Sequence, residues 1–241
     1  MLKLNILSIF LLFSITVTTQ EKKQDSTSVP KPKSFITSHQ ITNGGKVIKY
    51  KAIASETYLK NTSDEPVASI WSVAYVQEGV DDQTKRPVTF VFNGGPGSAS
   101  VWLHMGMFGP ELVKVNSEAK EDDGAAPYNL TKNRNGLIDL TDLVFIDPVG
   151  TGYSRVIGKG KVEEYWGLNE DAKSIAQFMR QWITKNNRWF SPKYIAGESF
   201  GTTRAVTVAN ALEKDGQNMA LNGLILISQA LDYAGSTSVN D

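Results

Sequence analysis

Residues 194–203 read YIAGESFGTT, and this stretch decides the fold. The residues from Lys193 to Ala196 are typical of a short buried strand, and those from Thr202 to Leu212 are typical of a helix. Between them, residues 197–201 (GESFG) fit the G-x-S-x-G pattern of a nucleophile elbow. A serine on so sharp a turn stands clear of the backbone, and flanking glycines leave room for it. The pattern predicts Ser199 as a nucleophile; a plain Gly/Ser turn is the alternative.

Other apolar runs surround this stretch. The runs at 87–92, 143–147 and 223–228 are typical of buried strands, and residues 163–185 carry one apolar stripe at helical spacing. Residues 41–60 and 67–78 alternate apolar and polar side chains, which favours antiparallel strands at the start of the sheet. The alternation of strand and helix from residue 87 onward predicts an α/β fold with a mainly parallel central sheet and helices on both faces.

A glycine-rich loop follows the run at 87–92. Residues 93–97 read NGGPG, and three glycines in five residues leave backbone N–H groups uncovered. In α/β-hydrolases the loop at this place supplies one donor of the oxyanion hole, and the residue after the nucleophile, here Phe200, supplies the other. A simple tight turn is the alternative interpretation of the same residues.

The composition is that of an ordinary globular protein. The 241 residues are 41% hydrophobic and 21% charged, with 25 basic and 25 acidic side chains. A net charge of +0 argues against nucleic-acid binding. The sequence contains no cysteine, so disulfides are excluded, which suits a bacterial envelope protein better than a disulfide-rich eukaryotic one.

The N-terminus has its own pattern. Residues 1–20 combine Lys3, an apolar run and a polar exit, which predicts a signal peptide and a secreted or periplasmic protein without a membrane span after cleavage. An uncleaved anchor is the alternative. Residues 21–40 are rich in Lys, Ser and Pro and are interpreted as a disordered linker, with His39 at the surface. Residues 41–241 are expected to form the N-terminal part of the α/β domain.

Three motifs in order carry a family resemblance: NGGPGSAS at 93–100, DPVGTGYSR at 147–155 and GESFG at 197–201. Together they resemble the serine carboxypeptidase family of the α/β-hydrolase fold, and residues 101–110 are more similar to its bacterial members. The resemblance implies Ser199 as nucleophile of a peptide hydrolase, an oxyanion hole from Gly95 and Phe200, and no metal or cofactor. It also implies that Asn93, Gly94 and Glu198 bind the terminal carboxylate of a peptide; Glu198 would then hold a proton, which favours acidic pH. A buried acid that only orients the loop is the alternative for Glu198.

The sequence departs from the family at the carboxylate site. Where relatives have a second glutamate, fourteen residues after the asparagine, this chain has Met107, and Glu111 is out of register. Asp147 precedes the nucleophile and is interpreted as structural. His104 lies in the region that lines the family's substrate cleft, where a substrate contact and a packing role both remain open.

The two histidines, His39 and His104, both precede Ser199, whereas this fold orders its triad as Ser, acid, His. The resemblance therefore implies the N-terminal half of such a protein, which stops before the helical insertion and the last strands, with the triad acid and histidine beyond residue 241. Two alternatives remain: another α/β-hydrolase activity (aminopeptidase, esterase or acyltransferase), or an inactive truncated product. The oligomeric state is not predicted.

Overall fold

The fold is given by a computed structural model that describes residues 29–114, 128–214 and 218–232. The expected signal peptide, and the part of the linker before residue 29, lie outside the described residues. No helix within the described ranges is long and apolar enough to cross a membrane.

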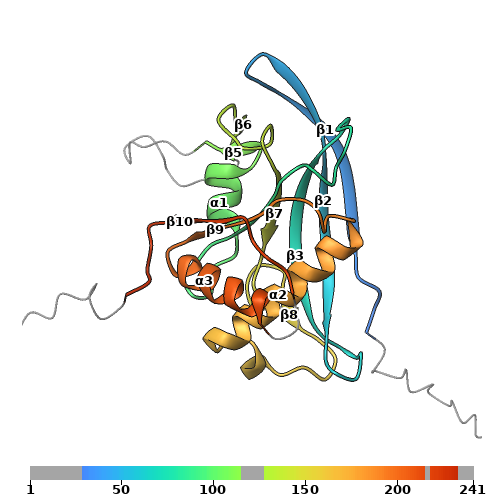
Figure 1. Cartoon of the computed structure of the whole chain (residues 1–241), viewed down its shortest axis with the longest axis vertical. Helices are drawn as coiled ribbons and strands as arrows, with labels where there is room; N and C mark the ends of the chain where they lie inside the picture. Colours follow the sequence, from blue (N-terminus) through green and yellow to red (C-terminus); the bar gives the residue numbers. More distant parts are fainter. Residues whose placement is uncertain (1–28, 115–127, 215–217, 233–241) are drawn as a thin grey trace, which may run out of the picture.

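One eight-stranded sheet runs through the molecule in the order β1-β2-β3-β7-β4-β9-β10, and β8 pairs with β3 (Figure 1). The pairs β1–β2, β2–β3 and β3–β7 are antiparallel. The pairs β7–β4, β4–β9 and β9–β10 are parallel. The prediction of an α/β sheet with a parallel core is therefore confirmed. The strand bounds are β1 Ser34–Asn43, β2 Lys46–Lys60, β3 Pro66–Gln77, β4 Val88–Phe92, β7 Asp142–Ile146, β8 Arg155–Val156, β9 Lys193–Glu198 and β10 Gly223–Ile227.

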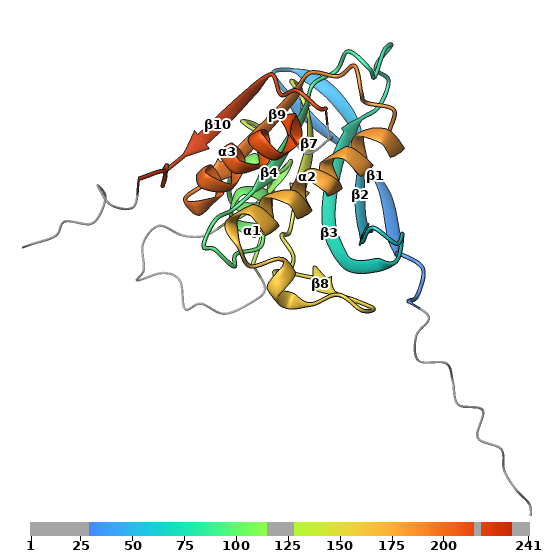
Figure 2. The ribbon, with the colours of Figure 1, turned by 60° about the horizontal axis from the view of Figure 1, so that its bottom comes forward.

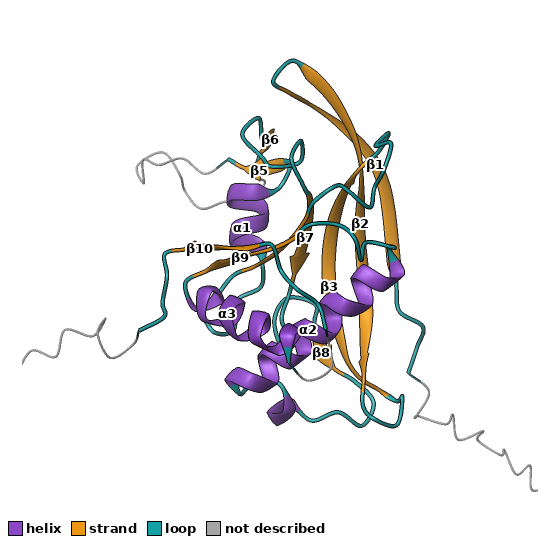
Figure 3. Cartoon of the chain, in the orientation of Figure 1, coloured by secondary structure: helices purple, strands orange, loops and turns teal. Residues whose placement is uncertain are grey.

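Helices cover both faces of the parallel half of this sheet (Figures 2 and 3). Helices α2 (Leu168–Lys185) and α3 (Phe200–Glu213) pack against Phe90 and Phe92 of β4. On the other face, α1 (Val101–Leu103) and the π-helical turn His104–Phe108 pack against Val91 of the same strand. Alternate residues of β4 thus fill two cores, as expected for a strand that is buried on both faces.

Smaller elements complete the fold. A separate hairpin joins β5 (Glu111–Val113) to β6 (Leu130–Lys132), and a 3₁₀ turn spans Val162–Glu164. The helix expected over 163–185 begins only at Leu168, with Gly167 as its N-cap. At the end of the sheet order, β10 leaves Leu224 and Ile225 exposed.

The linker interpretation is wrong for residues 34–40, because these residues form most of β1. They pair antiparallel with β2 across the Gly44–Gly45 turn. Apart from Ile41 and Asn43, every β1 side chain is exposed, so the strand has no apolar alternation in its sequence. Backbone hydrogen bonds to β2 hold it in place, and these leave no compositional signal. His39 is exposed, as expected, and its ring stacks on Tyr50.

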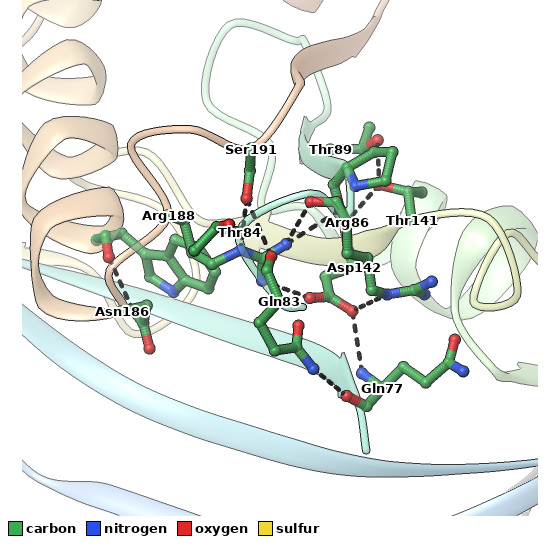
Figure 4. Close-up of polar contacts among 12 residues, drawn as sticks. Gln77, Gln83, Thr84, Arg86, Thr89, Thr141, Asp142, Asn186, Arg188 and Ser191 are labelled. Atoms are coloured by element: carbon green, nitrogen blue, oxygen red, sulfur yellow. Dashed lines mark hydrogen bonds and ion pairs between the residues drawn. The ribbon is translucent and has the colours of Figure 1, made fainter. Parts of the chain in front are cut away.

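A buried ionic cluster fixes the edge of the sheet where the parallel strands begin (Figure 4). Asp142, with 0% of its side chain exposed, accepts from Arg86 Nε at 2.7 Å and from Arg188 Nη1 at 2.6 Å. The backbone N–H of Gln77 adds a third hydrogen bond at 3.0 Å. Because β4, β7 and β9 are parallel and all start here, their carboxyl ends lie together at the opposite edge of the sheet, where the motifs at 93–100, 147–155 and 197–201 follow them.

Candidate active site

Ser199 occupies a strained turn between β9 and α3. Its φ of 55° and ψ of −124° lie in a region that residues with a side chain rarely adopt. Two hydrogen bonds hold Ser199 in this conformation. The N–H of Ser199 donates to the carbonyl of Ile227 at 3.0 Å, and Thr202 Oγ1 donates to the carbonyl of Ser199 at 2.7 Å. The strand, turn and helix predicted around GESFG are therefore all present.

The glycines of the two motifs allow the close approach of three backbone segments. A Cβ atom at Gly197 would collide with the carbonyl of Gly201, and one at Gly94 would collide with the backbone N of Phe200. At Gly201 an added Cβ would lie 3.0 Å from the carbonyl oxygen of Phe92. A side chain at Gly94 or Gly201 would push the loop after β4 away from the first turn of α3, and one at Gly197 would distort the Ser199 turn itself.

Both candidate oxyanion donors lie at this contact. Gly95 has a φ of +105°, and Phe200 is the first residue of α3, where helix N–H groups have no partner within the helix. Ser199 and Gly95 line one cavity of about 500 Å³. The other residues that line this cavity are Asn93, Ser98, Trp102, Leu103, Met107, Glu198 and Ile227. The structure thus brings together the site residues that the sequence predicts.

Asn93 and Glu198 contact each other inside this cavity. Asn93 Nδ2 donates to Glu198 Oε2 at 3.1 Å, and Asn93 Oδ1 accepts from the N–H of Leu103 at 3.0 Å. The second bond fixes which end of the amide faces the carboxylate. Asn93 is buried, whereas Glu198 is partly exposed to the cavity.

Met107 lines the same cavity and is 47% exposed. Glu111 does not replace the missing acid, because its carboxylate pairs with Lys132 on the neighbouring strand β6. Within the described residues, the cavity therefore holds one carboxylate, that of Glu198.

Neither histidine lies at Ser199. His104 Nε2 is hydrogen-bonded to Tyr75 Oη at 2.7 Å, its ring stacks on Phe145 at 4.3 Å, and burial lowers the pKa of His104 to about 4. It is absent from the lining of the Ser199 cavity, which favours the packing role. Asp147 has the structural role expected: its Oδ1 accepts from Ser100 N at 2.9 Å and from Ser100 Oγ at 2.8 Å.

Sequence reasoning missed one buried pair beneath the site. Arg204 of α3 is 2% exposed; its Nε donates to Asp171 Oδ2 of α2 at 2.6 Å, and its Nη1 donates to the carbonyl of Asn93 at 2.5 Å. Its guanidinium lies 5.3 Å from the ring centroid of Phe200 and 5.4 Å from that of Phe92. Burial raises the pKa of Asp171, and the charge of Arg204 opposes that shift. The one feature of the sequence that corresponds to this pair is a charged residue among the buried positions of each helix, Asp171 in α2 and Arg204 in α3.

Comparisons with known proteins agree with this geometry. A family model described as serine carboxypeptidase matches residues 57–238. The chain is 24% identical to a carboxypeptidase Y homolog of Arthroderma benhamiae, over 76% of this chain and 34% of that protein. It is 26% identical to serine carboxypeptidase-like 13 of Arabidopsis thaliana, over 58% of this chain and 31% of that protein.

One solved structure has a similar fold at a TM-score of 0.52. It is the prohormone-processing carboxypeptidase KEX1(Δ)P of Saccharomyces cerevisiae, 22% identical, with 73% of this chain and 38% of that chain covered. The chain spans about a third of the length of the curated relatives described above (31% and 34%). These relatives are plant and fungal, so the resemblance to bacterial members stays a prediction.

Proposed function

Because this chain belongs to the serine carboxypeptidase family and has the α/β-hydrolase fold, we propose that it serves the removal of C-terminal residues from peptides, with Ser199 as the nucleophile. The observation that carries the proposal is the shared cavity: Ser199 on its positive-φ turn, Gly95 of the glycine-rich loop, and the hydrogen-bonded pair Asn93 and Glu198 all line it.

The proposed reaction is acyl transfer in two steps. Ser199 Oγ attacks the scissile carbonyl carbon, its proton passes to a general base and then to the leaving amine, and an acyl-enzyme remains for water to hydrolyse. The N–H groups of Gly95 and Phe200 would stabilise the oxyanion, and the N-terminal end of α3 favours the same negative charge.

The general base is not His39 or His104, since one lies on the exposed strand β1 and the other packs against Tyr75 and Phe145. We therefore expect residues 1–241 by themselves to hydrolyse peptides negligibly, because a serine without a base loses several orders of magnitude in rate.

Asn93 and Glu198 give the site its proposed preference for a free C-terminus. The Asn93 amide can donate to a substrate carboxylate at any pH, whereas Glu198 attracts that carboxylate only when it carries a proton.

Met107 supports a second candidate, another acyl hydrolase such as an aminopeptidase, an esterase or an acyltransferase. Its thioether occupies cavity surface where the family resemblance leads one to expect a second acid, so recognition of a carboxylate rests on one acid instead of two.

The test uses the full-length gene product that contains these 241 residues. We expect it to cleave a blocked dipeptide but not the C-terminal amide of the same dipeptide, and we expect Ser199→Ala to abolish cleavage. Equal cleavage of acid and amide would select the second candidate. No Ser199-dependent cleavage of peptides or esters would contradict both. We further propose export, with a mature N-terminus near residue 20, which N-terminal sequencing of envelope and secreted fractions can check.

A further inference from the structure

A second cavity of about 450 Å³ lies beside the first, on the far side of the candidate oxyanion hole. The two cavities are lined by consecutive residues: Gly95 lines the first and Pro96 the second, and Ser199 lines the first and Phe200 the second. The border between the cavities therefore runs between Gly95 and Pro96 and between Ser199 and Phe200, next to the candidate oxyanion donors.

The position of this cavity follows from the arrangement of the helices. Its lining residues come largely from the first turns of α2 and α3 and from the loop after β7. Both helices cover the same face of the sheet (Figure 2). Three aromatic side chains form much of its wall: Tyr165, Trp166 and Phe200. Trp166 is 72% exposed, so an aromatic surface faces solvent at this site.

The buried pair Asp171 and Arg204 supplies the polar part of the wall. Arg204 uses Nε for Asp171 and Nη1 for the carbonyl of Asn93. Within the described residues, Arg204 Nη2 and Asp171 Oδ1 form no hydrogen bond, and neither atom belongs to the fully buried atoms that lack a partner. The pair thus adds one donor and one acceptor to a wall that is otherwise mostly aromatic and aliphatic.

The chemistry of this wall selects a ligand group. An ion pair has no net charge, so a charged ligand would gain from one partner and be repelled by the other. A phenol hydroxyl donates one hydrogen bond and accepts another, which matches Oδ1 and Nη2, and its ring suits the aromatic wall. A phenylalanine side chain would fill the same space but leave both polar atoms without a partner.

We infer that this second cavity binds the acyl-side residue of the substrate and favours tyrosine there. The inference rests on the proposed function, because the scissile carbonyl at Gly95 and Phe200 puts the leaving residue toward Asn93 and Glu198. The preceding residue then extends to the other side, and successive residues of an extended chain lie about 3.3 Å apart. One residue is enough to pass from the first cavity to the second.

The test measures binding rather than turnover, by ligand-observed saturation-transfer NMR on residues 1–241. The probes are N-acetyl-tyrosine amide and N-acetyl-phenylalanine amide, which carry no free carboxylate. The tyrosine probe should bind at least about fivefold more tightly, the difference expected of one net hydrogen bond. Equal affinities, or no saturable binding of either probe, would overturn the inference.

Variants locate the binding site. Leu168, the first residue of α2, lines this cavity and is partly exposed, so Leu168→Trp should block both probes. The matched control Val206→Trp, at an exposed position of α3 that does not line the cavity, should leave binding within about twofold. Arg204→Met should remove the preference for tyrosine while the phenylalanine probe still binds. If Arg204→Met does not fold, the effect of Leu168→Trp and the ratio of the affinities of the two probes for the wild type still test the inference. Binding that survives Leu168→Trp would overturn the inference.

The proposed function can fail separately. If the full-length product shows no Ser199-dependent hydrolysis while the tyrosine probe binds as expected, the reaction is wrong and the cavity assignment of a tyrosine ligand stands. If hydrolysis depends on Ser199 but the two probes bind equally, only the tyrosine preference is wrong.

Discussion

The side-chain amide of Asn93 donates a hydrogen bond to the carboxylate of Glu198, with 3.1 Å between Nδ2 and Oε2. These residues lie 105 positions apart, at the ends of the neighbouring parallel strands β4 and β9. Arg204 fixes the same loop from below, because its Nη1 holds the carbonyl of Asn93. The loop that carries one candidate oxyanion donor is thus tied to both flanks of Ser199, which keeps the site ordered before a substrate arrives.

Replacing Gly94 by alanine tests this close approach. The added Cβ would collide with the backbone N of Phe200 and lie 2.8 Å from that of Gly201, so the loop must move away from the proposed oxyanion hole. We expect kcat/KM of the full-length product to fall by about 10²-fold or more, as for loss of an oxyanion donor. Gly106→Ala is the matched control, because a Cβ there meets nothing within 4 Å. A similar kcat/KM in both variants would contradict the role of the loop.

The Asp142 cluster predicts where a single polar change is most destabilising. Asp142→Ala leaves the guanidinium groups of Arg86 and Arg188 buried without their partner, and should lower the free energy of unfolding by about 3–5 kcal/mol. Lys60→Ala removes an exposed pair with Asp64 and should cost no more than about 0.5 kcal/mol. Urea unfolding of residues 1–241 measures both. Equal effects would show that the cluster does not hold the sheet edge.

The sequence predicted the central part of the site because backbone constraints there require particular residues. The positive φ of Ser199 requires glycines on either side, and the close approach of Gly94 to Phe200 leaves no room for a side chain. Both motifs can therefore be recognised in the amino-acid sequence. The Arg204 and Asp171 pair was not predictable, since neither helix pattern says which residue of α2 faces α3. Strand β1 was missed for a different reason: most of its side chains are exposed without regular apolar alternation, and backbone pairing with β2 holds the strand in place.

His104 should make stability depend on pH. Burial lowers its pKa to about 4 in the folded protein, whereas a histidine in the unfolded chain has a pKa of about 6.5. Between these values the unfolded state binds the proton and the folded state does not, so stability falls as the pH drops from about 6.5 to about 4. Over this pH range, protonation of His104 should lower the free energy of unfolding by on the order of 3 kcal/mol.

His104→Gln removes this titration and keeps a polar atom for the Tyr75 hydroxyl. We expect urea midpoints of the variant to change less than those of the wild type between pH 6.5 and pH 4. His39→Gln is the control, because His39 lies exposed on β1. If the urea midpoint of His104→Gln changes with pH as much as that of the wild type, His104 has the same affinity for the proton in the folded and unfolded states.

Glu198→Gln tests how the site recognises a carboxylate, and it needs no turnover. N-acetyl-leucine keeps its carboxylate ionised above about pH 4, so an ionised Glu198 would repel it. Glutamine always donates, so the variant should bind at least about tenfold more tightly than wild type at pH 7. Glu111→Gln, which alters a carboxylate paired with Lys132, should behave as wild type. If N-acetyl-leucine amide binds as well as the acid and Glu198→Gln changes neither, Glu198 does not read a C-terminus, and the esterase or acyltransferase alternative gains the support that the carboxypeptidase proposal loses.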